Sequence, residues 1–400
     1  MSTLYSWTRF AARTAAAAAG IEGRPTKLMF VVTKRCHSRC VYCDIWKAKD
    51  TPGALDAELT LDEVRSIAAA NPFFHWIDFT GGEPTDRPDF VEVVKTFAAA
   101  SPDLLLVHFP TNGIATRRIE KIATELRASL RARLIVTVSI DGPPELNDRL
   151  RGIRNDFAHA VDTFAALRRI LGAENVFAGM TLHGHKSSTG HTSPELVELT
   201  YAAVNDALRA RSETPIGWST LHLNIPHFSS HYYGNAASRD AADGFGGPSH
   251  RAEIAAALHL AASKSRQGLS AMGVIERIYR AEATRYLDTG RTSIACSALL
   301  STVYLSEKGE VFPCTIWDRP LGNVRNSAYA LMPIVDAARR AGVRRAIAHG
   351  QCPNCWTPCE AYPAIAASPV RSLLAAARPR RPTTPAMGDA APSAPHPQTS

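Results

Sequence analysis

Residues 28–43 read LMFVVTKRCHSRCVYC, a short apolar run followed almost directly by three cysteines. The run itself, LMFVV (28–32), is the length of a β-strand and carries bulky apolar side chains, which predicts a buried strand. Cys36, Cys40 and Cys43 then follow with three and two residues between them. Three thiolates cannot complete the four-coordination of zinc, nor bind all four irons of a cubane cluster. The stretch therefore predicts a strand that leads into a metal or cluster site with one open position.

Five further apolar runs of the same kind follow along the chain. They are WIDFT (76–80), LLLVHF (104–109), LIVTVSI (134–140), NVFAGMTL (175–182) and TLHLNI (220–225). Segments of helical period, among them 60–70, 156–171 and 194–211, lie between these runs. Strands that alternate with helices indicate βαβ units and a parallel sheet. We predict an α/β fold with six such units over residues 27–230, as an open sheet or a partial barrel, with functional groups at the C-terminal strand ends.

Helix starts and a hairpin are also marked in the sequence. Thr60 and Glu63 form a capping-box pattern, and Ser193 is expected to cap the next long helix, with Pro194 in its first turn. Residues 226–248 break the strand–helix pattern and predict a loop over the site. The segment TVYLSEKGEVFP (302–313) predicts a hairpin that turns at Lys308-Gly309. Further helices are expected over 249–266, 272–286 and 330–348.

These patterns divide the chain into six expected parts. They are an N-terminal basic extension (1–26), a core (27–230), a loop and helical connector (231–289), a small cysteine-bearing domain (290–362), a C-terminal helix (363–378) and a disordered tail (379–400). Six prolines and almost no large apolar side chain occur in the tail, so it cannot bury enough surface to become ordered.

Composition excludes several classes of protein. With 400 residues, 45% of them hydrophobic and 20% charged, the chain has the composition of a globular protein. No run of 18 apolar residues occurs, so no transmembrane segment is expected. The net charge is 45 − 37 = +8, and because much of it lies in the two ends, charge gives no reason to expect nucleic acid as a partner. The alanine-rich N-terminus suggests a frayed, basic helix or a signal peptide, and we favour the helix and a cytoplasmic location.

The first cysteine group resembles the signature of the radical S-adenosylmethionine (SAM) superfamily, which has this spacing and an aromatic residue, here Tyr42, before the last cysteine. The resemblance implies that Cys36, Cys40 and Cys43 bind a 4Fe–4S cluster and that the amino and carboxylate groups of SAM chelate its open iron. The reduced cluster would cleave SAM to methionine and a 5′-deoxyadenosyl radical, which abstracts a hydrogen atom from the substrate. A zinc site completed by a histidine such as His37 is the alternative.

Two strand-end motifs extend the resemblance. Gly81, Gly82, Glu83 and Pro84 end the second strand and match the GGEP motif, which implies binding of the SAM amino group. Two glycines let the backbone approach a ligand closely, and a carboxylate accepts hydrogen bonds from an ammonium group. The third strand ends in residues 111–113, Thr-Asn-Gly, which are frequent there in the family and are expected either to line the pocket or to form a simple turn.

The fourth and fifth strands agree with the family to different degrees. Ser139 and Asp141 lie in a segment that resembles the family's SIDGP, and they alternate with Ile140, so both are expected to contact the ribose or methionine part of SAM. Arg149 or Arg151 could meet the SAM carboxylate, or lie on the surface. The end of the fifth strand, residues 179–183, departs from the family pattern, so we assign no contact with the SAM adenine there.

The second cysteine group resembles the auxiliary-cluster domain called SPASM, or its shortened form, twitch. Its spacing is Cys296-x12-Gly309-x4-Cys314 followed by Cys352-x2-Cys355. The resemblance implies one auxiliary 4Fe–4S cluster bound by these four cysteines, and a structural zinc ribbon is the alternative. Pro358 restricts the residue before it to extended geometry, so we expect the chain to turn away before Cys359 and leave that thiol without iron.

Together the motifs imply a partial (βα)6 TIM-like barrel with a small C-terminal twitch-like β-hairpin and helix domain. The implied function is that of a radical SAM oxidoreductase or modifying enzyme, which requires a reducing partner such as flavodoxin or ferredoxin. We favour a small-molecule, sugar or lipid-linked substrate, because the first strand starts near residue 28 and leaves no room for an N-terminal peptide-recognition domain. A maturase of a ribosomally made peptide is one alternative, and a zinc-stabilised binding module on an inactive core is another.

No catalytic residue is assigned from the sequence. Histidines 183, 185, 222, 227 and 231 gather near strand ends and the following loop. They are expected either to accept a substrate proton or to be satisfied polar residues.

Overall fold

A computed structural model describes residues 3–182, 189–237, 248–265 and 271–368. Within these residues the strands form one sheet of nine, in the order β6-β5-β4-β3-β2-β1-β7-β8-β9. The first six are β1 (Lys27–Thr33), β2 (Trp76–Gly81), β3 (Leu106–Thr111), β4 (Arg133–Ser139), β5 (Val176–Thr181) and β6 (Leu221–Asn224). All pair in parallel with their sequence neighbours. Each begins and ends within two residues of its predicted position.

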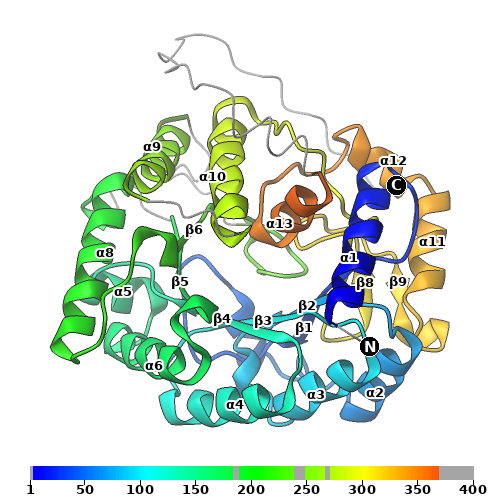
Figure 1. The fold of residues 1–400 in the computed structure, drawn as a ribbon, viewed down its shortest axis with the longest axis horizontal. Helices are drawn as coiled ribbons and strands as arrows, with labels where there is room; N and C mark the ends of the chain where they lie inside the picture. The colour runs from blue at the N-terminus through cyan, green and yellow to red at the C-terminus, as the bar shows by residue number, and fades with distance from the viewer. Residues whose placement is uncertain (1–2, 183–188, 238–247, 266–270, 369–400) are drawn as a thin grey trace.

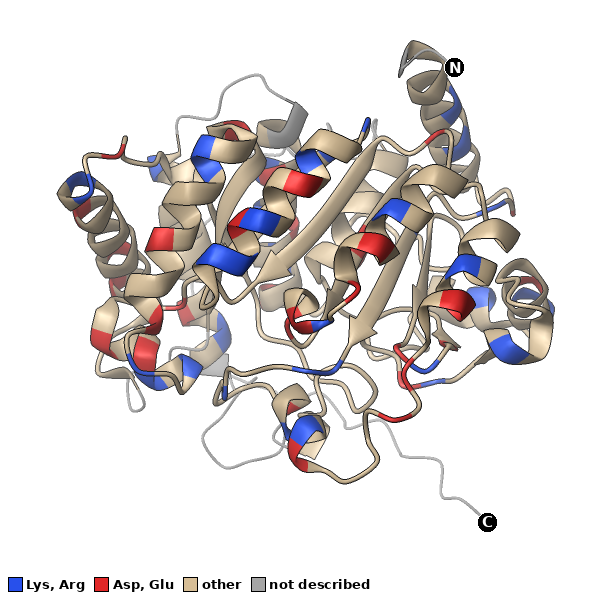
Figure 2. Ribbon diagram, turned by 90° about the horizontal axis from the view of Figure 1, so that it is seen from below, with Lys and Arg blue, Asp and Glu red and all other residues tan. Residues whose placement is uncertain are grey.

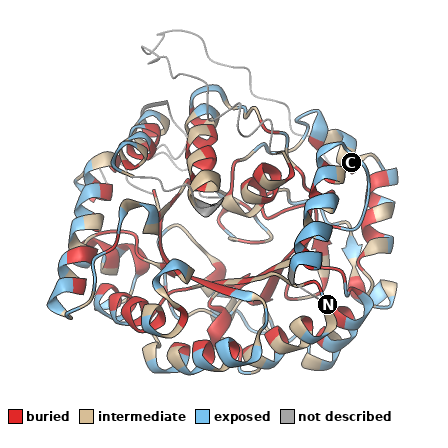
Figure 3. Cartoon of the chain, viewed as in Figure 1, coloured by how far each residue is buried: buried red, intermediate tan, exposed pale blue. Residues whose placement is uncertain are grey.

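Helices cover the outer face of this curved sheet, so the chain forms the predicted α/β partial barrel (Figure 1). They are α2 (Leu61–Ala70), α3 (Phe90–Ala100), α4 (Thr116–Ser129), α6 (Asp156–Leu171) and α8 (Ser193–Ala210), while the short α5 (Pro144–Arg151) follows β4 and packs against α6. Their buried sides turn toward the strands and their exposed sides toward solvent (Figure 3). The core between the layers is rich in phenylalanine; Phe30, Phe79 and Phe97 pack with ring centroids 5.8–6.3 Å apart.

The helix starts test the capping predictions. Thr60 caps α2, and the reciprocal bonds between Thr60 and Glu63 confirm the capping box. For α8 the predicted cap is wrong by one residue, because Thr192 is the N-cap and Ser193 is the first helical residue. The reason is that Glu195 stands three residues after Thr192 and completes a second capping box.

The C-terminal hairpin continues the barrel sheet. Strand β7 (Thr302–Leu305) pairs in parallel with β1, and β8 (Glu310–Phe312) pairs antiparallel with β7 and with β9 (Gly322–Asn323). The predicted turn is confirmed, with Gly309 at φ +81° between the two strands. The cysteine-bearing segment is therefore joined to the core through backbone hydrogen bonds.

The remaining helices complete the far side of the barrel. Helices α9 (Pro248–Lys264) and α10 (Ala271–Thr289) occupy the predicted connector. The single helix expected over 330–348 is wrong, because α11 (Met332–Arg340) and α12 (Val343–Ala348) are separated at Gly342, whose φ of +79° breaks the helical path. Helix α13 spans Pro358–Ala367. Most of the helix expected over 363–378, and the whole predicted tail, lie outside the described residues.

The N-terminal helix α1 (Thr3–Ala18) is docked rather than frayed. Arg9 pairs with Asp103 at 2.6 Å, and the Arg13 guanidinium donates to the carbonyls of Phe73 and Pro25. These partners precede β1, β2 and β3, so α1 lies at the N-terminal end of those strands.

Charges of both signs are interspersed over the outer helices (Figure 2). Some pairs link neighbouring helices, such as Lys95 of α3 with Glu125 of α4 at 2.5 Å. No helix in the described part of the chain combines the length and apolar character needed to cross a bilayer.

Candidate active site

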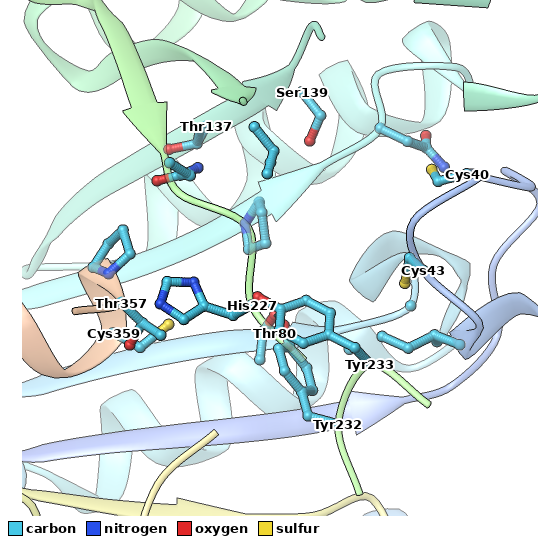
Figure 4. Close-up of a pocket in the computed structure, with 18 of the residues that line it drawn as sticks. Cys40, Cys43, Thr80, Thr137, Ser139, His227, Tyr232, Tyr233, Thr357 and Cys359 are labelled. Atoms are coloured by element: carbon cyan, nitrogen blue, oxygen red, sulfur yellow. The ribbon is translucent and has the colours of Figure 1, made fainter. Parts of the chain in front are cut away.

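A cavity of about 540 Å³ runs through the barrel along the inward faces of its strands. Alternate residues of each strand point inward, as in Trp76, Asp78 and Thr80 of β2, while Ile77 and Phe79 pack under the helices. One end of the cavity, the cysteine end, lies at the C-terminal ends of the strands and is lined by Cys36, Cys40, Cys43, Tyr42, Gly82, Glu83 and Arg151. The opposite end, the floor, is lined by Trp76, Asp78, His108, Thr137, Phe177, His222, Thr357 and Cys359. Parts of both ends appear in Figure 4.

The loop that carries the first three cysteines is held by backbone hydrogen bonds from two sides. The Arg39 and Val41 amides donate to the carbonyls of Arg151 and Leu150, at the end of α5. From the other side, the Asp44 amide donates to the Tyr233 carbonyl, 2.9 Å away, in the loop that follows β6. The loop is therefore held by backbone hydrogen bonds from α5 and from the predicted loop over the site.

Three thiols converge at the cysteine end. Cys36, Cys40 and Cys43 are free and line the same cavity. Burial is the main cause that raises the pKa of Cys36 and of Cys43 to about 12, and the negative charges of Glu83 and Cys40 (for Cys36) and of Cys40 (for Cys43) contribute to the rise. Among the described residues, no three His, Cys, Asp or Glu side chains stand at the spacing of ligands of one metal ion. Cluster cysteines bind different irons, so this donor set fits a multinuclear cluster with an open position.

Gly81 and Gly82 let two strand exits pack together. A Cβ added to Gly81, which has φ +148°, would overlap the Thr33 carbonyl, and one on Gly82 would overlap the Arg35 carbonyl and lie 2.9 Å from Cys36 Cβ. The Gly82 amide donates to the Thr33 carbonyl at 2.9 Å. The sequence predicts that these glycines let the backbone approach a ligand. Both line the cavity, and the absence of side chains also admits the backbone that leads into the cysteine loop.

Glu83 is buried, with 2% of its surface exposed, and lines the cavity. Its Oε1 accepts hydrogen bonds from the hydroxyls of Thr85 (2.6 Å) and Thr111 (3.0 Å). Its Oε2 accepts a hydrogen bond from the backbone amide of Asn112 (2.7 Å). Burial raises the pKa of its carboxyl. Glu83 lies just after the end of β2, as predicted, and these contacts show that it also ties the ends of β2 and β3 together. Pro84 begins a 3-10 turn and is not among the cavity-lining residues.

This geometry predicts different outcomes for two Glu83 variants. Glu83→Ala leaves buried donors without an acceptor, so we expect a loss of unfolding free energy of at least about 1–3 kcal/mol. Glu83→Gln keeps one carbonyl acceptor and the side-chain volume but removes the charge, so we expect a smaller loss of stability and a SAM affinity lowered about 10–100-fold. Denaturant unfolding and equilibrium dialysis with SAM measure the two effects. Unchanged stability of Glu83→Ala would contradict the structural role.

Asp141 does not line the cavity but accepts hydrogen bonds from three residues that do. It is 1% exposed and accepts hydrogen bonds from the Tyr42 hydroxyl, from Arg151 Nη1 at 3.1 Å and from the Thr181 amide at 2.8 Å. Ser139, Tyr42 and Arg151 line the cavity. The structure thus brings Asp141 to the cysteine end as a positioning residue, and it places Arg149 on the surface, outside the cavity.

In the second cysteine group, four thiols are electrostatic neighbours of one another, and the fifth, that of Cys359, lies apart from them. The thiol of Cys355 interacts with those of Cys314 and Cys296, and Cys296 interacts with Cys352. Cys359 instead lines the floor of the barrel cavity, where Lys27 and Asp78 are its strongest charged neighbours. The residue before Pro358, Thr357, has extended φ/ψ of −77° and 147° as predicted, and α13 starts immediately after it.

The floor was missed by sequence reasoning. Lys27 pairs with Asp78 at 2.7 Å, the His108 ring lies 3.3 Å from the same carboxylate, and the other ring nitrogen of His108 lies 3.0 Å from the Thr137 hydroxyl. A signal was present, since Asp78 and His108 interrupt apolar strands at inward positions. Because parallel strands buried on both faces are expected to be apolar throughout, polar residues inside them mark the cavity wall.

Comparison with known proteins places these features in context. Residues 30–188 match the model of the radical SAM superfamily. Mycofactocin maturase MftC from Mycobacterium tuberculosis is 34% identical over 129 residues, which cover 32% of this chain and 31% of that protein. The PqqA peptide cyclase from Bradyrhizobium diazoefficiens is 29% identical over 200 residues, 49% of each chain. Streptococcus suis SuiB bound to S-adenosylmethionine aligns with a TM-score of 0.47 and 12% identity, over 82% of this chain and 71% of SuiB. The matches to the two curated relatives span about a third to a half of those proteins' length.

Proposed function

We propose that the chain is a radical SAM modifying enzyme, because residues 30–188 match the model of the radical SAM superfamily. The observation that supports the proposal most directly is the convergence of Cys36, Cys40 and Cys43 on a cavity whose other wall is formed by Gly82 and Glu83. We propose that the three thiolates bind a 4Fe–4S cluster at the cysteine end. When bound, the cluster and SAM supply a 5′-deoxyadenosyl radical that abstracts a hydrogen atom from the substrate.

Two residues of the chain are assigned roles toward this cofactor pair. Among the described residues, Glu83 Oε2 accepts a single hydrogen bond, from the backbone amide of Asn112. This oxygen therefore retains an acceptor position for the SAM ammonium group. Arg151 is buried, with 7% of its surface exposed, and interacts electrostatically with Cys40, so its positive charge stabilises thiolates that bind iron. Tyr42 and Asp141 hold the Arg151 side chain in place.

For the second cysteine group we propose one auxiliary 4Fe–4S cluster bound by Cys296, Cys314, Cys352 and Cys355. Such a group supplies a one-electron redox centre. Residues 27–230 form the catalytic core in this proposal, and residues 290–362 form the auxiliary segment that extends its sheet. A low-potential one-electron donor such as flavodoxin or ferredoxin is the proposed reducing partner. Because all eight cysteines are free, we propose the cytoplasm, where thiols stay reduced.

The substrate proposal has two forms. We favour a small-molecule, sugar or lipid-linked substrate, because the cavity reaches the full length of the strands to a floor inside the barrel. The alternative is a peptide substrate, which the name of the PqqA peptide cyclase favours.

Metal content and SAM cleavage test the proposed function. Protein purified without oxygen is expected to be brown and to hold about eight irons per chain, the content of two cubane clusters. With dithionite it is expected to convert SAM to methionine and 5′-deoxyadenosine. Colourless protein that contains zinc would contradict the enzyme proposal and support a zinc-stabilised binding module.

A further inference from the structure

The cavity floor has no unpaired charge among its described residues. Of the described residues that line the cavity, the Asp, Glu, Lys and Arg side chains are Asp78, Glu83 and Arg151. Asp78 alone lies at the floor, and it is matched by Lys27 at 2.7 Å and by a hydrogen bond from Trp76 Nε1 at 2.5 Å. Burial alone would raise the pKa of Asp78, but Lys27 and the neighbouring histidine hold it below the usual value. A phosphate or carboxylate would need an unpaired cation here, and an ammonium group would need an unpaired carboxylate.

Three uncharged polar atoms near the floor have no partner within the described structure. They are the Thr357 hydroxyl and the Nε2 atoms of His222 and His227, all in cavity-lining residues. Burial lowers the pKa of His227 to about 4 and also lowers that of His222, so both rings are neutral and each can accept or donate one hydrogen bond. Thr357 and His227 lie with Cys359 at one end of the view in Figure 4.

The Thr357 hydroxyl is the most informative of these atoms. Thr357 is the N-cap residue of α13 and is 2% exposed, yet its side chain makes no capping hydrogen bond. Threonine at this position normally bonds to a backbone amide of the first turn. A buried hydroxyl without any partner costs free energy. Thr315 also has such a hydroxyl, but Thr357 belongs to the cavity wall, so a partner from a ligand would remove this cost at Thr357.

Aromatic rings form much of the remaining wall. Phe177 stacks on His222 with centroids 4.2 Å apart, and Trp76 and Tyr362 also line this region. Mostly apolar walls with a few placed polar atoms are the usual construction of small-molecule sites. Flat apolar faces suit the C–H face of a ring.

We propose that the floor binds a neutral ring that carries at least two hydroxyl groups, the chemical class of a sugar or cyclitol. Hydroxyl groups both donate and accept, so they can pair with a threonine hydroxyl and with neutral histidines in either tautomer. A phenol has a single hydroxyl and would leave at least one of the polar atoms unpaired. This inference rests on the proposed function, since the same cavity holds the cysteine end.

Equilibrium dialysis of the full chain, loaded with its clusters and SAM, tests the inference. The probes are radiolabelled myo-inositol and methyl glucoside as neutral polyols, 4-methylphenol as the single-hydroxyl ring, and myo-inositol 1-phosphate as the charged analogue. We expect at least one neutral polyol to bind, and the phenol and the phosphate to bind about tenfold more weakly. Thr357→Val removes one hydrogen bond and is expected to weaken polyol binding about 5–10-fold.

Thr315→Val is the matched control, because Thr315 also has a buried, unpartnered hydroxyl but does not line the cavity. It is expected to leave polyol binding unchanged. His227→Phe, a change at another cavity-lining residue with an unpartnered polar atom, is expected to weaken polyol binding as well, so the inference remains testable if one variant fails to fold. Equal binding of the phosphate or phenol, no binding of either polyol, or equal effects of Thr357→Val and Thr315→Val would each overturn the inference. SAM is measured in the same cells; retained SAM binding with no polyol binding rejects the floor inference alone, whereas absent SAM binding rejects the proposed function.

Discussion

Replacing Cys36, Cys40 and Cys43 together by alanine is expected to lower the formation of 5′-deoxyadenosine by more than about 100-fold, because even outer-shell partners of metal ligands contribute about 10–100-fold. Within the part of the chain that the structure describes, these three thiols lie at the C-terminal ends of the barrel strands, beside Glu83. The variant is expected to keep about four irons, those of the auxiliary cluster. Iron analysis, the visible spectrum and chromatographic measurement of 5′-deoxyadenosine provide the three readouts.

His37→Ala is the control for this experiment, and it separates cluster from zinc. His37 lies in the same loop, its side chain is 68% exposed, and its Nδ1 lies 2.6 Å from the Asp86 carboxylate. If the three cysteines bind a cluster, His37→Ala keeps its iron and its activity. If they bind zinc with His37 as the fourth ligand, the histidine variant loses metal as the triple variant does. SAM cleavage by the triple variant at the wild-type rate would refute the core assignment.

The barrel could be predicted because its signals are local. Each strand is a continuous apolar run, since both faces of a parallel sheet are buried, and the helix starts carry their own capping residues. The exceptions are also local: Thr192 competes with Ser193 for the cap of α8, and Gly342 divides one expected helix into two. The place of β7 beside β1 could not be predicted, because nothing in residues 302–305 encodes which edge of the sheet they join.

The site could be predicted only as a set of residues. The motifs identified Gly82 and Glu83, but the direction in which each faces depends on contacts between segments that are 29 residues (Glu83 and Asn112) and 47 residues (Gly82 and Arg35) apart in the chain. Gly82 packs against the cysteine loop, and Glu83 accepts a hydrogen bond from Asn112 of the next strand exit. The floor was harder still, because Lys27 and Asp78 lie within or beside apolar runs and become a buried ion pair only when β1 and β2 align.

The five C-terminal cysteines allow a direct test of the auxiliary ligand set. Cys355→Ala, made in the chain that lacks the first three cysteines, is expected to lose the remaining iron, about four atoms per chain. Its thiol interacts with those of Cys314 and Cys296, so removing it opens the proposed four-cysteine set. Iron analysis after reconstitution, together with the visible absorption of the cluster, measures the loss.

Cys359→Ala is the matched variant, the same substitution four residues later. Cys359 faces the barrel cavity, and its backbone carbonyl accepts a hydrogen bond from Lys27 Nζ at 2.8 Å, whereas none of the other four cysteines is among its main electrostatic neighbours. Its separation follows from the start of α13 at Pro358, which carries the chain from the Cys352–Cys355 pair to the floor. We therefore expect Cys359→Ala to keep all of its auxiliary iron. Loss of the cluster in Cys359→Ala with retention in Cys355→Ala would show instead that Cys359 is a ligand and that the four-cysteine assignment is wrong.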